Sequence, residues 1–195
     1  MVVSDSMAKH TKIRKGEVQA YSGDTIRRLT ERLSRGEVGV RGYSRIIVHV
    51  GTNDLSNMMR RKNFRTVTIY SIISAYKGLL EAIRRLNPNA LVIFSSILPR
   101  TKGYRIMKPY VRGANFALEK LCAQSQGTCV FLPSFRWFLK EGRPVAEYFS
   151  KKDGLHLRGK GIVRLADCFT QGFATGYLLK RLAKARTRKL ASLRF

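Results

Sequence analysis

Two short stretches of this sequence carry residue types that could catalyse a reaction through proton transfer. Asp153 and His156 lie together in Asp-Gly-Leu-His near the end of the chain. An aspartate so close to a histidine can orient the imidazole and stabilise it when the ring is protonated. The histidine could then accept a proton and return it to a leaving group. Asn53 follows a short apolar run, where its side-chain N–H could stabilise a developing oxyanion. Taken singly, each is more often a structural hydrogen-bonding or turn residue.

Ser6 is the candidate nucleophile, in Val-Val-Ser-Asp-Ser-Met at positions 2–7. Residues 2–3 have the character of a strand end, and a turn into a helix is expected to follow. A serine at such a turn is exposed, and the helix N-terminus favours negative charge beside it. The same position also suits a helix N-cap. From this stretch alone, the N-cap is the better interpretation.

Hydrophobic periodicity predicts the elements that must position these residues. Short β-branched or apolar runs, typical of buried parallel strands, occur at 46–50, 90–98 and 128–132, and 17–21 is also expected to be a strand. Helical spacing is expected at 22–34, 66–86, 111–126 and 161–180. This alternation predicts a single α/β domain with polar residues at the carboxyl ends of its strands.

Taken together, the blocks around Ser6, Asn53 and His156 resemble the SGNH (GDSL-like) hydrolase family. The resemblance covers residues 2–176 and departs from the family pattern at Ser4, where the family has glycine. It implies that Ser6 is the nucleophile, His156 the general base and Asp153 its orienting carboxylate. It also implies an oxyanion hole made of the Ser6 and Gly23 backbone N–H groups and the Asn53 side chain.

The same resemblance implies a three-layer α/β/α sandwich with a mostly parallel, five-stranded, flavodoxin-like sheet. The expected activity is hydrolysis of carboxylic esters through an acyl-enzyme, without cofactor or metal. Short-acyl, acetyl and lipid esters are all candidate substrates, and related folds include carbohydrate O-acetylesterases. The rival hypothesis is a catalytically inactive module with this fold, retained for RNA or membrane binding. Residues 154–161 also approach a phosphate-binding loop but lack its final Ser/Thr, so we reject a nucleoside triphosphate site.

The charge of the chain predicts a polyanionic partner. Lys and Arg number 38 against 12 Asp and Glu, for a formal net charge of +26. RNA, DNA or an anionic membrane surface would complement it. Two segments are the candidate nucleic-acid surfaces: a basic, aromatic loop expected at 102–110, and a basic amphipathic extension at 177–195. Their candidate contact residues are Arg105, Lys108, Lys180, Arg181, Lys184, Arg186, Arg188 and Lys189.

The domain organisation expected is a hydrolase-like domain at 1–176 followed by that extension. Three cysteines without metal-binding spacing predict reduced thiols and an intracellular location, cytoplasmic or nuclear. No signal peptide or transmembrane run is apparent, and the sequence gives no oligomeric state. The short first strand suggests an excised domain or missing upstream sequence. A strongly basic chain with this fold also resembles, more narrowly, the esterase domain of an animal non-LTR retrotransposon's first-open-reading-frame protein.

Overall fold

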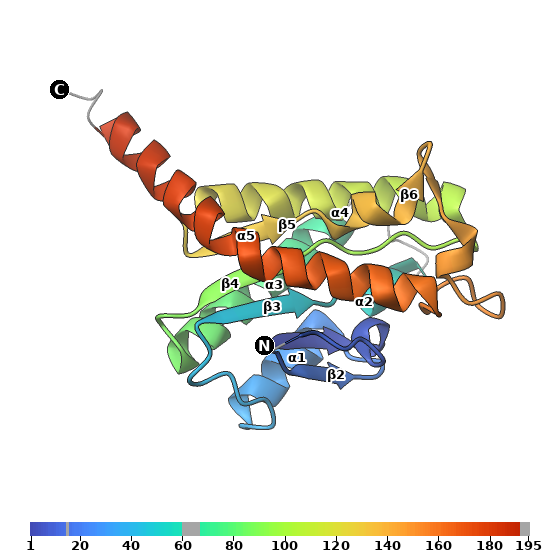
Figure 1. The fold of residues 1–195 in the computed structure, drawn as a ribbon, viewed down its shortest axis with the longest axis horizontal. Coiled ribbons are helices and arrows are strands. Elements are labelled where there is room, and N and C mark those ends of the chain that lie inside the picture. The colour runs from blue at the N-terminus through green and yellow to red at the C-terminus, as the bar shows by residue number, and fades with distance from the viewer. Residues whose placement is uncertain (15, 60–66, 192–195) are drawn as a thin grey trace.

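The protein is built on one parallel sheet, shown in a computed structural model that describes residues 1–14, 16–59 and 67–191 (Figure 1). The strand order is β2-β1-β3-β4-β5, and every neighbouring pair is parallel. The strands are β1 (Val2–Asp5), β2 (Val18–Tyr21), β3 (Arg45–His49), β4 (Leu91–Ser95) and β5 (Cys129–Leu132). The predicted five-stranded α/β/α architecture is therefore confirmed.

The two faces of the sheet are buried by different helices, because successive side chains of a strand point to opposite faces. Val48 and Phe94 belong to the core on the side of α1 (Ile26–Ser34), α3 (Val67–Leu86) and α4 (Tyr104–Gln124). Ile47 and Ile93 belong to the opposite core, which α5 (Lys160–Ala191) covers. Figure 1 shows α5 crossing the sheet and its C-terminal part projecting beyond it. Apolar runs without polar alternation thus mark strands buried on both faces.

Short elements complete the connections. The helix α2 (Thr52–Met59) directly follows β3, and three 3₁₀ helices are η1 (Ser6–Ala8), η2 (Ser134–Phe138) and η3 (Ala146–Tyr148). A small antiparallel hairpin pairs β6 (Leu139–Lys140) with β7 (Arg143–Pro144). The segment 134–148 therefore has regular structure of its own.

Three sequence-based boundaries are wrong. The loop predicted at 102–110 is mostly helix, since α4 begins at Tyr104 and continues through Pro109. The first strand includes Ser4 and Asp5, and Ser6 is the first residue of a 3₁₀ helix that Asp5 caps. Asn53 lies in the first turn of α2 and not in a loop. The predicted division at 176/177 stays a prediction, and α5 runs across it.

The strand order brings the candidate residues to one edge of the sheet. Ser6 follows β1, while Gly23 and Asn53 follow β2 and β3, the strands on either side of it. The carboxyl ends of parallel strands meet at a single edge, which is where α/β folds place their ligands. His156 reaches the same edge from the segment that leads into α5.

Candidate active site

A chain of polar contacts joins the two ends of the sequence. Ser6 Oγ lies 3.2 Å from Nε2 of His156, across a separation of 150 residues. On the other side of the ring, Nδ1 of His156 lies 2.8 Å from Oδ2 of Asp153. Hydroxyl, imidazole and carboxylate are therefore connected in series at hydrogen-bonding distances. This is the arrangement in which a serine can lose its proton to a histidine held by an aspartate.

The carboxylate of Asp153 is fixed by its own loop. Its Oδ1 accepts hydrogen bonds from the backbone N–H groups of Leu155, at 2.8 Å, and His156, at 3.0 Å. Desolvation raises the pKa of Asp153, but hydrogen bonds from the His156 ring and these N–H groups outweigh it and lower the pKa to about 2. Asp153 is therefore ionised near neutral pH and can stabilise a protonated imidazole.

Gly154 docks the histidine loop onto the loop that follows β4. Its carbonyl accepts hydrogen bonds from the backbone N–H of Thr101, at 2.8 Å, and from the Thr101 hydroxyl, at 3.2 Å. The backbone has φ +63°, and an added Cβ would lie 2.4 Å from Thr101 Oγ1 and 2.6 Å from the Lys102 nitrogen. Only glycine fits this contact without displacing the loop. The sequence placed Gly154 in the Asp-Gly-Leu-His block but gave no sign of this role.

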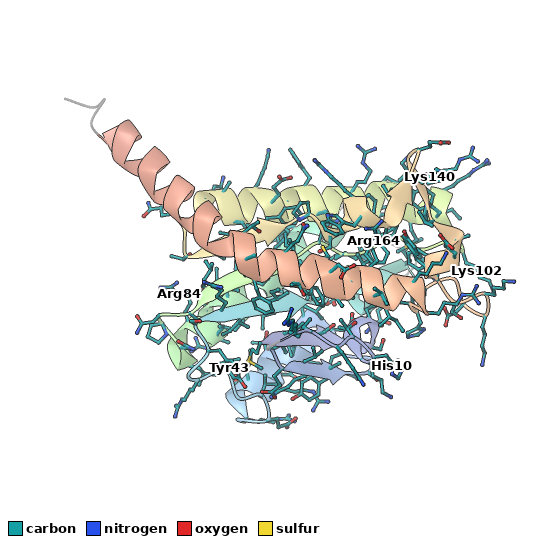
Figure 2. The ribbon with its side chains drawn as sticks, in the orientation of Figure 1. His10, Tyr43, Arg84, Lys102, Lys140 and Arg164 are labelled. Carbon is teal, nitrogen blue, oxygen red and sulfur yellow. The ribbon has the colours of Figure 1, made fainter. Side chains whose placement is uncertain are left out.

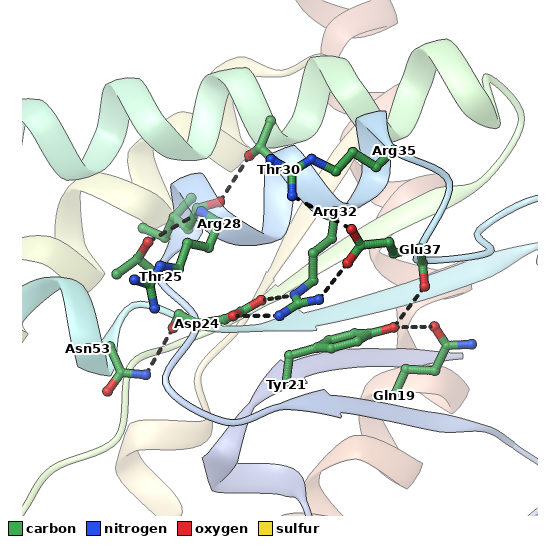
Figure 3. Close-up of polar contacts among 11 residues, drawn as sticks. Gln19, Tyr21, Asp24, Thr25, Arg28, Thr30, Arg32, Arg35, Glu37 and Asn53 are labelled. Carbon is green, nitrogen blue, oxygen red and sulfur yellow. Dashed lines mark hydrogen bonds and ion pairs between the residues drawn. The ribbon is translucent and has the colours of Figure 1, made fainter.

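Asp24, the residue after Gly23, links Asn53 to Arg32, as Figure 3 shows. The Asn53 side chain donates to the Asp24 carbonyl at 2.9 Å. The buried Asp24 carboxylate accepts from Arg32 Nε at 2.7 Å, and the same guanidinium pairs with Glu37. This network ties the loop after β2 to both α1 and α2. The sequence alone does not predict these partners of Arg32.

Two adjoining hollows surround these groups. Gly23, Asn53 and Asp153 line a groove of about 870 Å³, and an added Cβ on Gly23 would meet nothing within 4 Å. Ser6 and His156 line a smaller hollow of about 280 Å³. The hollows adjoin because the Asp153–His156 contact bridges them. The structure thus brings Ser6, His156 and Asp153 into one chain of contacts, and Asp153, Gly23 and Asn53 into one groove.

Asp5 is a residue at this site that the sequence did not single out. Its Oδ1 accepts from the Met7 N–H at 2.9 Å, which caps the 3₁₀ helix carrying Ser6. Burial raises the pKa of Asp5 from 3.8 to about 7, even though the Met7 hydrogen bond opposes the change. Its neighbour Ser4 is fully buried in β1, beside Ala20 of β2 and His49 of β3. The serine in place of the family glycine is thus accommodated within a paired strand.

His49, Arg105 and Lys108 line neither of these two hollows. His49 is buried with Nδ1 2.9 Å from Ser95 Oγ, and burial lowers its pKa to about 4. Arg105 and Lys108 lie on α4. The candidate tail residues lie beyond the side chains that the structure describes, namely Lys180, Arg181, Lys184, Arg186, Arg188 and Lys189.

The described residues contain no group of three or more His, Cys, Asp or Glu arranged to hold a metal ion. Cys122, Cys129 and Cys168 are buried free thiols. Across the same residues, no helix combines the length and the apolar character that crossing a membrane requires.

The sequence itself shows the protein family to which this fold and site belong. Residues 3–162 match the GDSL-like Lipase/Acylhydrolase family, and the chain belongs to it. The chain matches no curated protein.

Solved structures share the fold at low sequence identity. A lipase from a goat rumen metagenome is 17% identical with a TM-score of 0.68, over 86% of this chain and 93% of the other. A carbohydrate esterase family 3 protein from Talaromyces cellulolyticus is 19% identical with a TM-score of 0.63, over 95% and 97%. The esterase domain of the zebrafish ZfL2-1 retrotransposon ORF1 protein is 19% identical over 89% and 97%, with a TM-score of 0.47. At that score, the likeness does not extend the family assignment to retrotransposon proteins.

Proposed function

We propose that the chain is a serine esterase that hydrolyses carboxylic esters through an acyl-enzyme. The observation that carries this proposal is the contact chain from Ser6 through His156 to Asp153, at the edge of a groove lined by Gly23 and Asn53. A serine or histidine with a purely structural role would not need two further polar groups joined to it in series by hydrogen bonds. Membership of the GDSL-like Lipase/Acylhydrolase family also supports ester hydrolysis as the reaction.

The first half of the reaction forms the acyl-enzyme. Ser6 Oγ attacks the ester carbonyl carbon while Nε2 of His156 takes the hydroxyl proton, and the carbonyl oxygen becomes an oxyanion. The backbone N–H groups of Ser6 and Gly23 and the Asn53 side chain stabilise that oxyanion. The C–O bond to the alcohol then breaks, and the imidazolium gives its proton to the departing alkoxide.

The second half regenerates the serine. Water attacks the acyl carbon and His156 takes its proton, so the same oxyanion site is used again. Collapse releases the carboxylic acid, and Ser6 recovers its proton from the imidazolium. Throughout, the Asp153 carboxylate stabilises the protonated ring and keeps Nε2 directed at Ser6. The aspartate itself is not protonated, consistent with its low pKa.

Turnover of p-nitrophenyl esters of increasing acyl length tests this proposal. We expect wild type to release p-nitrophenol and Ser6→Ala to fall to the uncatalysed rate, with the preferred acyl length separating acetyl from lipid esters. The matched control is Ser34→Ala, the same change at an exposed hydroxyl on the far end of α1, which should turn over as wild type does. If wild type and Ser6→Ala are equally inactive at every acyl length, the alternative of an inactive binding module replaces this proposal.

We also propose that the esterase associates with RNA through its positive charge. The net charge of +26 supports this, since it is several times what solubility requires. Combined with the fold, the charge also supports the narrower hypothesis of a retrotransposon esterase domain. The buried, unpaired cysteines agree with an intracellular, cytoplasmic or nuclear, location.

The extension at 177–195 is the first surface to test for RNA association. If it contacts about five phosphates of a single strand, log K should fall with log salt at a slope near −3.5. Removing the residues after Gly176 should then flatten the slope. An unchanged slope would exclude the extension from binding, and preferential loss of binding to anionic vesicles would indicate a membrane surface instead.

A further inference from the structure

Helix α4 carries a stripe of aromatic and basic side chains. Tyr104, Lys108, Arg112, Phe116 and Lys120 recur every fourth residue along it. Consecutive members of the row are neighbours on the helix, but each step of four residues advances by about 40°, so the row winds about 160° around α4 along about 24 Å of its length. Figure 2 shows nitrogen-tipped side chains extending from α4 away from the sheet. We call these five residues the α4 stripe.

A groove of about 370 Å³ runs beside the stripe, between α4 and the segment that begins at η2. Lys108, Arg112 and Phe116 line its helix side, and Phe135 and Arg136 line the opposite side. The groove is a separate feature from the candidate active site, because none of the catalytic or oxyanion candidates lines it.

The floor of the groove is held in place by buried polar groups. Asn115 donates to the Ile97 carbonyl at 2.9 Å and accepts from the Ile97 N–H at 2.8 Å. Ser96 Oγ accepts from the Phe135 N–H at 2.6 Å. These contacts tie α4 and η2 to the segment after β4, so the two sides of the groove are fixed relative to each other.

Phe116 is unusual for its exposure. Its side chain is 58% exposed, although large aromatic residues are normally buried. Lys120 Nζ lies 4.5 Å from the centre of the ring, and Lys108 Nζ lies 5.8 Å from the ring of Tyr104. An exposed ring beside positive charge can stack with a base while a cation pairs with the adjacent phosphate.

The cations of the groove are available for such pairing. Lys108, Arg112 and Arg136 form no ion pair with any carboxylate in the described part of the chain. Arg32, by contrast, is engaged by both Asp24 and Glu37. Glu119 is the sole carboxylate among the described residues lining the groove, against three cations. The groove therefore has an excess of positive charge beside apolar and aromatic surface.

We propose that this groove and the α4 stripe bind single-stranded nucleic acid. A base stacks on Phe116, and phosphates pair with Lys108, Arg112 and Arg136. A duplex would offer the phosphates but keep its base faces stacked inside, so it would leave Phe116 without a partner. The inference rests on the proposed RNA association and locates it on α4. It does not depend on ester hydrolysis.

Fluorescence anisotropy with a short labelled oligouridine tests the proposal on the full chain. We expect Phe116→Ala to weaken binding by about 5- to 100-fold, the range for losing one stacked base, without changing the salt slope. The double variant Arg112→Gln/Arg136→Gln should weaken binding and reduce the salt slope by about 1.4, for two lost phosphate contacts. Melting temperature and ester turnover are measured in parallel, and both should stay near wild type.

The matched control is Arg41→Gln/Arg85→Gln, which removes the same charge at exposed positions off α4. Equal losses of oligouridine affinity in the groove variant and the control variant would overturn the proposal, because affinity would then follow total charge. It would also be overturned if the groove variants lost binding only to vesicles containing about one-fifth phosphatidylserine, with oligouridine binding intact. Ser6→Ala should bind oligouridine as wild type does, so failure of the esterase proposal and failure of this one give different results.

Discussion

The buried carboxyl group beside the nucleophile makes stability depend on pH in a direction opposite to most carboxylates. Asp5 is about 1% exposed, and one of its oxygens, Oδ2, has no hydrogen-bond partner among the residues that the structure describes. Burial raises its pKa from 3.8 to about 7. The folded protein therefore holds a proton on Asp5 at pH values where the unfolded chain has released it. Between these pKa values, the free energy of unfolding must fall as pH rises.

The size of the effect follows from the two pKa values. Each unit of difference between folded and unfolded states is worth about 1.4 kcal/mol, so Asp5 destabilises the fold by up to about 4 kcal/mol above pH 7. Asp5→Asn keeps an oxygen that can accept from the Met7 N–H and removes the ionisation. Relative to wild type, the variant should gain stability steadily from about pH 4 to about pH 7 and then level off.

Urea unfolding followed by the fluorescence of Trp137, the sole tryptophan, measures this difference. Asp54→Asn provides a comparison, because burial raises the pKa of Asp54 to about 6, despite hydrogen bonds from the backbone. The gain in free energy of unfolding for Asp54→Asn should be smaller, about 3 kcal/mol, and should be complete at a lower pH. A difference between wild type and Asp5→Asn that is constant within about 0.5 kcal/mol across this range would refute the reasoning.

Three further substitutions test the geometry of the site. Gly154→Ala should lower kcat by about 10²-fold or more, because a shift of about 1 Å in a loop that positions a catalytic group has that effect. A crystal structure of this variant should show the histidine loop displaced from Thr101. Asn53→Ala should cost about 10²–10³ in kcat with little change in melting temperature, as measured by initial rates; an unchanged kcat would remove Asn53 from the oxyanion hole. Ser4→Gly should leave ester turnover within a fewfold of wild type, because the Ser4 side chain already fits inside β1. A large gain in turnover would instead mean that Ser4 distorts the turn.

The sheet and the clustering of candidate residues could be predicted because their signals are local. The β-branched run at 46–50 is apolar at every position except His49, which is typical of a strand buried on both faces. Ser6, Gly23 and Asn53 each follow a predicted strand, and parallel strands bring their carboxyl ends to one edge. The catalytic roles of these residues stay predictions, supported by the contacts that the fold makes between Ser6 and His156.

The features that could not be predicted depend on contacts between distant segments or on competing local signals. The basic and aromatic composition of 102–110 suggested a loop, but α4 begins at Tyr104 and continues through Pro109. The pairing of Arg32 with Asp24 depends on how α1 folds back on the loop that precedes it. The burial of Asp5 depends on packing that its own sequence does not reveal. Gly154 is required by Thr101, which is 53 residues away along the chain.

The central claim is that Ser6 is a nucleophile activated by His156. Covalent labelling tests it most directly: a fluorophosphonate loses fluoride and forms an O–P bond to an activated serine, and peptide mass spectrometry locates the adduct. The account predicts one adduct, on Ser6, that is absent in Ser6→Ala and strongly slowed in His156→Ala, with Ser34→Ala labelled as wild type. A folded wild-type protein that takes no label, or takes it on another residue, would contradict the account.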